Sequence, residues 1–291
     1  MTKTVMITGA SNGFGYLTAI KCAEKGFRVI ATMRNMSYAD RFEQEVKNPN
    51  VLARIIPRQL DVTDHDSIRS FEISLATIDR IDVLINNAGM AVGGFVEEVP
   101  VEDYRKQFET NFFGMVAVTQ LVLPIMRRQG FGKILNVSSI SGLIGFPGLS
   151  PYVASKHAVE GFTESLRLEL KPFGIEAAMI EPGSFRTNIW TRGTYIPETA
   201  SQTGSPYADY MNRIKQYMEA SRETMAEPSQ VAAFTSKLVE RSAWSKVRHP
   251  VGKGVRPMIW TKRLLPWRVW EKLVIRKVLN KREEMHDEKD I

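Results

Sequence analysis

Short apolar segments alternate with longer amphipathic segments through most of the chain. Six of the apolar segments are rich in β-branched residues and end at Gly, Asp, Asn or Ser, which is typical of buried strands. They span residues 4–10, 27–34, 55–62, 81–89, 132–139 and 175–183. The stretches between them are long enough for helices. The pattern therefore predicts an α/β fold, in which a doubly wound parallel sheet has helices on both faces.

Two helix starts are marked by capping residues. Thr63 and Asp64 are N-cap candidates for the helix that follows the third predicted strand. Pro100 is followed by two acidic residues, which the dipole of a helix N-terminus favours. We therefore expect helices to begin at both places.

The segment after the sixth predicted strand has a different character. Residues 184–226 show no clear strand pattern, yet they carry many large apolar side chains. A connection of this length is usually functional or disordered, and the aromatic content argues against disorder. We therefore expect a lid that closes an apolar pocket together with the uncharged stretch 141–150. The alternative is that these side chains pack on one another or on a second subunit.

The net charge of +7 belongs to the C-terminal part of the chain. Residues 237–291 hold 15 of the 39 Lys and Arg but only 7 of the 32 Asp and Glu. A helix beginning at Pro266 would align four apolar side chains on one stripe, namely Trp267, Trp270, Val274 and Val278. Such a basic helix suits a membrane surface, but the same stripe suits docking on the domain or sealing a substrate pocket, and we favour docking. No recognised module accompanies the charge, so nucleic-acid binding is not expected.

The remaining bulk features indicate a single-domain cytoplasmic protein. We expect one domain over residues 1–255 and a basic helical extension over residues 256–291. Cys22 is the one cysteine, and a strand motif begins within ten residues of the start, which leaves no room for a signal peptide. The uncharged run 110–126 is too short to span a membrane. Four scattered histidines give no ligand spacing, so no metal site is predicted.

A glycine-rich turn follows the first predicted strand, with the sequence TGASNGFG over residues 8–15. Gly9, Gly13 and Gly15 allow a tight turn and a close approach of the backbone to a ligand. The free N–H groups of the helix that follows favour a pyrophosphate. The spacing is G-x-x-x-G-x-G and differs from the G-x-G-x-x-G fingerprint. Together with the strand pattern, the turn predicts a Rossmann-type nucleotide-binding domain.

The end of the second predicted strand indicates which nucleotide is preferred. An acidic residue at this place binds the ribose 2′-hydroxyl of NAD, whereas an arginine accommodates a 2′-phosphate. Met33 stands where the acid is expected, and Arg34 follows it. A guanidinium can hold a phosphate with two parallel hydrogen bonds. We therefore expect NADP(H) to be favoured over NAD(H), although Arg34 as an ordinary solvated residue is the alternative.

Five motifs together resemble those of the short-chain dehydrogenase/reductase family. They are TGASNGFG at 8–15, NNAG at 86–89, Ser139 in NVSS, YVASK at 152–156 and PGSFRT at 182–187. They occur in the order and spacing of that family and cover residues 4 to about 190. The chain looks closest to the hydroxysteroid/retinol dehydrogenase-like branch.

The resemblance implies an NADP(H)-dependent oxidoreductase that interconverts an alcohol and its ketone or aldehyde. Tyr152 is then the proton donor and acceptor, Ser139 holds the reacting oxygen, and Lys156 binds the nicotinamide ribose. Asn111 is the fourth member of the set and orders a water that links the lysine to solvent. Residues four apart share a helix face, so Lys156 can lie beneath the Tyr152 ring and lower its pKa.

The resemblance also assigns binding residues position by position. Cofactor contacts are expected from Gly9, Ser11, Asn12, Gly13, Phe14, Gly15, Arg34, Asp61, Val62, Asn87, Ala88, Gly89, Tyr152, Lys156, Pro182, Gly183 and Thr187. Many family members that use NADP have a basic residue at the position of Asn12, which weakens the NADP prediction. Contacts with a hydrophobic substrate that is lipid-like, steroid-like, retinoid-like or aromatic are expected from Ser139, Leu143, Phe146, Tyr152, Phe185 and Trp190.

Two further consequences follow from the resemblance. Family members commonly form dimers or tetramers through the two long helices that would contain Asn111 and Lys156, so a homo-oligomer is expected.

The main alternative function is a non-catalytic NADP-binding sensor or a membrane-associated interaction protein of the same fold. No catalytic residue is missing here, which makes this reading the weaker one. A sugar-nucleotide epimerase is disfavoured by the chain length and the glycine spacing.

Overall fold

A computed structural model describes the chain except for residues 1, 77, 188–193, 202–203, 223–224 and 280–291. Its main sheet has seven parallel strands in the order β3-β2-β1-β4-β6-β7-β9. The strands are β1 (Thr4–Ile7), β2 (Arg28–Met33), β3 (Ile55–Gln59), β4 (Val83–Asn86), β6 (Gly132–Val137), β7 (Ile175–Pro182) and β9 (Arg248–Val251). The strand order reverses between β1 and β4, which is where such folds bind their ligands.

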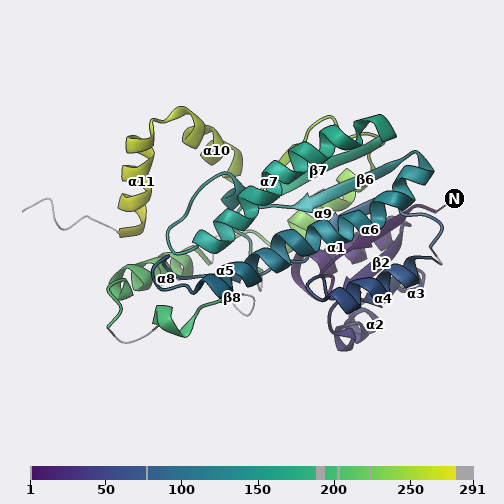
Figure 1. Cartoon of the computed structure of the whole chain (residues 1–291), viewed down its shortest axis with the longest axis horizontal. Helices are drawn as coiled ribbons and strands as arrows, with labels where there is room; N and C mark the ends of the chain where they lie inside the picture. Colours follow the sequence, from purple (N-terminus) through teal and green to yellow (C-terminus); the bar gives the residue numbers. More distant parts are fainter. Residues whose placement is uncertain (1, 77, 188–193, 202–203, 223–224, 280–291) are drawn as a thin grey trace, which may run out of the picture.

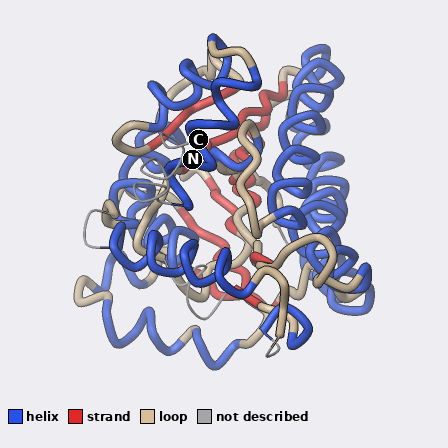
Figure 2. Tube along the Cα trace, turned by 90° about the vertical axis from the view of Figure 1, so that its left-hand side faces the viewer, coloured by secondary structure: helices blue, strands red, loops and turns tan. Residues whose placement is uncertain are grey.

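Helices cover both faces of the sheet, and Figure 2 shows the strands enclosed between them. One face packs on α1 (Gly13–Glu24), α2 (Asp40–Glu45), α3 (Pro49–Leu52) and α9 (Pro228–Glu240). The other packs on α4 (His65–Leu75), α6 (Gly114–Gln129) and α7 (Ser150–Leu170). The chain also forms short helical turns, namely η1 (Met36–Tyr38), η2 (Glu109–Phe113), η3 (Ile140–Gly142), η4 (Lys171–Phe173) and η6 (Glu198–Ser201). The predicted doubly wound α/β fold and its six strands are confirmed.

The seventh strand, β9, has no counterpart in the sequence prediction. Its sequence is Arg-His-Pro-Val, which lacks an apolar or alternating pattern. Pro250 cannot donate a ladder hydrogen bond, and β9 pairs only with β7 at the edge of the sheet. An edge strand tolerates proline for this reason.

The helix starts lie where the capping residues predict. The Asp64 carboxylate accepts hydrogen bonds from the backbone N–H groups of Asp66 and Ser67, at 2.8 and 3.3 Å. Pro100 precedes α5 (Val101–Phe108), which has two acidic residues in its first turn. From α5 the chain stays helical through η2 and α6, and Val101–Gln129 is long and apolar enough to cross a membrane. The inner face of α6 packs on the sheet, however.

The described parts of the segment 184–226 contain one strand of a small second sheet and a helix. β8 (Thr194–Tyr195) pairs in parallel with β5 (Ala91–Val92), and α8 (Ala208–Arg222) follows. The expectation of no sheet element here is therefore wrong, because a two-residue strand leaves no pattern in the sequence. Two tyrosines of the segment pack on the Phe95 ring, with ring centroids 4.5 Å away for Tyr207 and 5.0 Å away for Tyr210.

The C-terminal extension folds back on the domain as two helices, α10 (Val255–Leu264) and α11 (Trp267–Leu279), at one end of the molecule in Figure 1. Its inner side forms a cluster with the segment after β6, made of Ile140, Ile144, Val255, Ile259 and Trp270. Trp270 is buried, whereas Trp267 is 62% exposed. Of the alternatives for this stripe, the structure therefore shows docking on the domain.

Two buried carboxylates lie where α7 meets the edge of the sheet. Glu160 accepts a hydrogen bond from the Ser138 hydroxyl at 2.5 Å, and the Arg248 Nε lies 2.8 Å from Glu160 and 3.3 Å from Glu181. Among the residues that the structure describes, none donates a hydrogen bond of good geometry to either carboxylate oxygen of Glu181. The Arg248 guanidinium is thus shared by two buried carboxyl groups. Burial first, and then the neighbouring Glu160 charge, raises the pKa of Glu181 from 4.5 to about 8.

This raised pKa makes the stability of the protein depend on pH. The folded protein holds the Glu181 proton to a higher pH than the unfolded chain does, so the free energy of unfolding falls as pH rises from 4.5 to about 8. We expect Glu181→Gln to flatten this fall, measured as melting temperature against pH. Glu164→Gln is the control, since Glu164 pairs with the same Arg248 but is 52% exposed. Equal slopes for the wild type and Glu181→Gln would contradict the assignment.

Candidate active site

The N-terminal half of α7 holds the predicted tyrosine and lysine against the carboxyl end of β6. Both side chains are buried, Tyr152 at 4% and Lys156 at 5% exposure. The Lys156 Nζ donates a hydrogen bond to the Val137 carbonyl at 2.8 Å and lies 5.7 Å from the centroid of the Tyr152 ring. The lysine is therefore beside the ring, and its position is fixed by the last residue of β6.

Ser139 lies two residues beyond β6 and reaches the same tyrosine. Its side chain is hydrogen-bonded with Tyr152 and accepts a second hydrogen bond from the Ser141 backbone N–H at 3.1 Å. The second bond caps η3 and fixes the direction of the serine. A hydroxyl pair from Ser139 and Tyr152 is thus positioned to meet one ligand oxygen.

Asn111 lies in η2, where the helix widens into a π-turn, a feature frequent at functional sites. Its Oδ1 accepts from the Met90 N–H at 2.9 Å, and its Nδ2 donates to the Met90 carbonyl at 3.0 Å and to the Ser155 hydroxyl at 3.1 Å. The amide hydrogens are therefore used within the protein. A water held by Asn111 would have to use the second lone pair of Oδ1 or the backbone carbonyl.

The electrostatics of the pair differ from the expectation based on the sequence. Burial raises the pKa of Tyr152 to about 12, and the hydrogen bond with Ser139 opposes this rise. Burial also lowers the pKa of Lys156 to about 8, while the charge of Glu160 raises it. The lysine was expected to lower the tyrosine pKa, but burial raises that pKa and the hydrogen bond with Ser139, not the lysine charge, is what opposes the rise. At neutral pH the protein by itself holds Tyr152 as a neutral phenol that can donate a proton.

The glycine-rich turn forms a shallow cradle between β1 and α1. Gly9 and Gly13 have φ values of +66° and +57°, which favour glycine, and a side chain at Gly9 would come within 2.8 Å of the Ala88 backbone. The Asn87 amide donates to the carbonyls of Thr8 and Gly9 at 2.9 and 3.0 Å. The N-cap of α1, Asn12, makes no side-chain capping bond. These groups fit a pyrophosphate at a helix N-terminus.

The remaining predicted residues of the turn and of β4 lie around the same cradle. Ser11 and Asn12 are adjacent on its outer side, with the Asn12 Nδ2 3.5 Å from the Ser11 Oγ. The Thr8 hydroxyl accepts from the N–H groups of Asn87 and Ala88, at 2.9 and 3.0 Å, and so joins the ends of β1 and β4. Gly89 follows directly and lies against the Asn111 side chain.

Arg34 and Asp61 face each other at the ends of β2 and β3. The Arg34 Nε lies 3.9 Å from the Asp61 Oδ2, and the Arg34 side chain is 79% exposed. Asp61 Oδ1 accepts from both the backbone N–H and the hydroxyl of Thr63, at 3.0 and 2.8 Å. Val62 is buried beside Gly114. An exposed guanidinium next to the nucleotide cradle fits a 2′-phosphate.

The chain beyond β7 contains one wrong prediction. Pro182 ends β7, and Gly183 donates its N–H to the Val251 carbonyl at 3.0 Å. Thr187 is partly exposed two residues after Phe185. Phe185 itself is 1% exposed and packs edge-on against Phe14, with ring centroids 5.6 Å apart. It belongs to the core under α1 and does not line a substrate surface, because the chain turns inward after Gly183. Trp190 lies outside the described residues.

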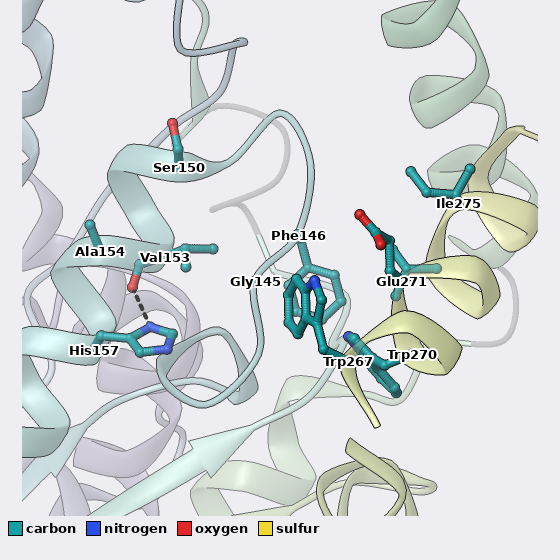
Figure 3. A pocket seen from close by; sticks show the side chains of 11 residues that line it. Gly145, Phe146, Ser150, Val153, Ala154, His157, Trp267, Trp270, Glu271 and Ile275 are labelled. Carbon is teal, nitrogen blue, oxygen red and sulfur yellow. Dashed lines mark hydrogen bonds between the residues drawn. The ribbon is translucent and has the colours of Figure 1, made fainter. Parts of the chain in front are cut away.

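The other two apolar residues predicted to touch substrate are connected to the C-terminal extension. Leu143 and Phe146 pack against the cluster around Trp270. Phe146 also lines a cavity of about 450 Å³ between the start of α7 and α11. Figure 3 shows the α11 side chains Trp267, Trp270 and Glu271 facing the loop that carries Phe146.

This cavity is separate from the reaction centre. It is lined on α7 by Ser150, Val153, Ala154 and His157. At 3.6 residues per turn these positions share one helix face, and Tyr152 and Lys156 lie on the opposite face. The lining of the cavity could not be predicted from the sequence, since it depends on how α11 folds back. Ser155 was also missed, although its place inside the YVASK motif beside Asn111 was a usable signal.

Known proteins are similar to this chain along most of its length. A family model described as short chain dehydrogenase matches residues 3–194. The chain is 46% identical to the uncharacterised oxidoreductase YusZ of Bacillus subtilis, over 96% of this chain and 99% of that protein. It is 39% identical to 3-ketodihydrosphingosine reductase of Bacteroides thetaiotaomicron, over 81% and 83% of the two chains.

Solved structures show the same fold. A short-chain dehydrogenase from Streptomyces avermitilis is 31% identical, with a TM-score of 0.77 over 96% of this chain and 97% of that one. ElxO with NADP bound is 25% identical, with a TM-score of 0.71 over 88% of this chain and 100% of that one. The matching family model and the YusZ similarity along nearly the whole length establish that the chain belongs to the short-chain dehydrogenase/reductase family of oxidoreductases.

Proposed function

We propose that the protein is an NADP(H)-dependent oxidoreductase that interconverts a hydrophobic alcohol and its ketone or aldehyde. The observation that carries the proposal is the meeting of Ser139 and Tyr152 through a hydrogen bond, with the Lys156 ammonium beside the Tyr152 ring. Asn111 is held one side chain away through Ser155. All four lie at the carboxyl end of the sheet, next to the glycine cradle.

In the reducing direction, Tyr152 donates its phenolic proton to the substrate oxygen as the carbonyl becomes an alcohol. Ser139 holds that oxygen by a hydrogen bond, and Lys156 stabilises the phenolate that remains. When bound, the nicotinamide cofactor supplies or accepts the hydride. The raised pKa of Tyr152 means that the proton donor is fully protonated near neutral pH.

The residues that would hold the cofactor are those of the cradle and the strand ends around it. Gly9, Gly13 and the first turn of α1 would take the pyrophosphate, and Arg34 the 2′-phosphate. Asp61 lies where the adenine is expected, and Thr187 where the carboxamide is expected. The ElxO structure, which has NADP bound, supports this choice of cofactor.

The proposed substrate is a ketone or alcohol on a long apolar chain. The stretch after Ser139 carries no charge through Ser150. The facing segment is also apolar here, because a Cβ added at Gly148 would lie within 3.7 Å of the Met211 and Ile214 side chains. The similarity to 3-ketodihydrosphingosine reductase supports a lipid-like substrate. The cytoplasmic setting and the division of the chain at residue 255 remain predictions.

The alternative is a non-catalytic sensor of the same fold that binds NADP. It requires that the Ser139, Tyr152 and Lys156 side chains serve only to bind the dinucleotide. The hydrogen bond between Ser139 and Tyr152, with the lysine beside the ring, favours chemistry instead. A protein that binds NADPH tightly and turns over no member of a broad ketone panel would support the sensor.

We expect Tyr152→Phe to lower turnover about a hundredfold or more, because it removes the proton donor and keeps the ring. The measurement is NADPH oxidation with 3-ketodihydrosphingosine and with simpler long-chain ketones, alongside NADPH binding by fluorescence. Binding should be retained. Tyr16→Phe is the control, since it removes another largely buried hydroxyl, which bonds Glu45 at 2.9 Å. Full turnover in Tyr152→Phe would remove the assigned role.

We expect the wild type to prefer NADPH over NADH, and Arg34→Ala to narrow that preference about tenfold, because a charge-assisted contact to the 2′-phosphate is lost. The measurement is kcat/KM for both cofactors. Arg58→Ala is the control, because Arg58 is exposed on neighbouring β3 and bonds only the Pro57 carbonyl among the contacts described. Equal use of both cofactors by the wild type would contradict the proposal.

We also propose that the protein is a homodimer or homotetramer formed through the helices of η2–α6 and α7. Phe113 and Leu168 on these helices are 52% and 76% exposed, so each helix leaves a large apolar side chain that a partner subunit would cover. Light scattering should give two or four times the chain mass of 32.9 kDa. A mass of one chain would contradict this assembly.

A further inference from the structure

The outward side of the C-terminal extension is unusually apolar. Among the described residues, 17 large hydrophobic side chains are exposed, and six of them lie between residues 260 and 275. They are Trp260, Leu264, Trp267, Val269, Leu273 and Ile275, with exposures from 39% to 76%. Trp267 and Ile275 line the cavity against α7, so Trp260, Leu264, Val269 and Leu273 form the outward side. These side chains are not needed to attach the extension, because Val255, Ile259 and Trp270 do so from the inner side.

The apolar side chains are spaced to form stripes. Trp260 and Leu264 are four residues apart on α10, so they lie on one face. On α11, Val269 and Leu273 are likewise four apart, and Lys272 and Arg276 each follow one of these positions by three residues. Each helix therefore presents neighbouring apolar side chains outward, flanked by cations.

The same two helices carry most of the excess positive charge. Residues 253–277 contain eight Lys and Arg, and Glu271 is the one acidic residue among them. The outward surface thus combines large apolar side chains suited to insertion into a membrane, including Trp260, with long basic side chains. This composition is that of helices which lie in the interface of a membrane.

We propose that α10 and α11 dock the protein on a lipid bilayer whose surface carries anionic headgroups. The apolar stripes would enter the boundary between headgroups and acyl chains, and the lysines and arginines would remain at the headgroups. A second copy of the chain fits this surface poorly, because it would bring a like excess of positive charge against it. A nucleic acid would leave the aliphatic side chains in water.

Docking in this orientation would bring the catalytic segment close to the bilayer. The inner side of the extension contacts Ile140 and Ile144, which lie one and five residues after Ser139. The surface proposal does not depend on the activity proposed above, since it is argued from exposed side chains and charge alone. A failure of either one therefore leaves the other standing.

The test uses the full chain and sedimentation with vesicles of phosphatidylcholine, with and without phosphatidylglycerol. We expect binding to the anionic vesicles and about tenfold weaker binding to phosphatidylcholine alone. Leu264→Ser with Leu273→Ser should weaken binding to anionic vesicles about tenfold. Ile73→Ser with Val96→Ser is the matched control, because these side chains are 71% and 69% exposed elsewhere on the surface. It should bind as the wild type does.

Three results would overturn the proposal. The first is no binding to anionic vesicles, or binding that the Leu264 and Leu273 substitutions leave unchanged. The second is a change in subunit number on light scattering caused by those substitutions, which would assign the surface to a second copy. The third is tighter binding to duplex DNA than to the vesicles. Unchanged circular dichroism and NADPH binding in both double variants show that they remain folded.

Discussion

The hydrogen bond from the Lys156 Nζ to the Val137 carbonyl fixes the geometry on which the proposed chemistry depends. It joins α7 to the end of β6, two residues before Ser139. Farther along the same pair of elements, Asn136 donates to the Thr163 hydroxyl at 2.9 Å. Two contacts therefore prevent α7 from sliding along the strand. Tyr152, one turn before the lysine, is consequently directed at Ser139.

Burial of this arrangement has an electrostatic cost that the protein distributes over several charged groups. Lys156 is shielded from water, and Glu160, one turn later on α7, supports its charge. Glu160 is in turn held by Ser138 and Arg248. The result is a chain of charges from the edge strand β9 to the reaction centre. The edge strand thus contributes a cation to the packing of the catalytic helix.

Much of the fold could be predicted from the sequence because buried parallel strands have a strong local pattern. The segments that became β1, β2, β4, β6 and β7 are largely buried and mostly apolar, and the turn at Gly9 requires glycine. β9 could not be predicted in this way, since an edge strand with Pro250 has little local signal. The pairing of β5 with β8 joins residues about a hundred positions apart and depends on the tertiary fold.

The site shows the same division between local and distant information. The placement of Tyr152 and Lys156 on one helix face follows from their spacing. Phe185 is aromatic, follows a strand and resembles a substrate contact in sequence, but its ring turns toward Phe14 because the core has space there. The raised pKa of Tyr152 likewise depends on burial, which only the folded chain reveals.

Transfer of deuterium tests the central claim most directly. The protein is incubated with 3-ketodihydrosphingosine and NADPH deuterated at one or the other face of the nicotinamide C4, and the product is analysed by mass spectrometry. The account predicts one deuterium on the carbinol carbon from one of the two labelled cofactors and none from the other. Alcohol product without deuterium from either cofactor, or no product from this or any long-chain ketone, would contradict it.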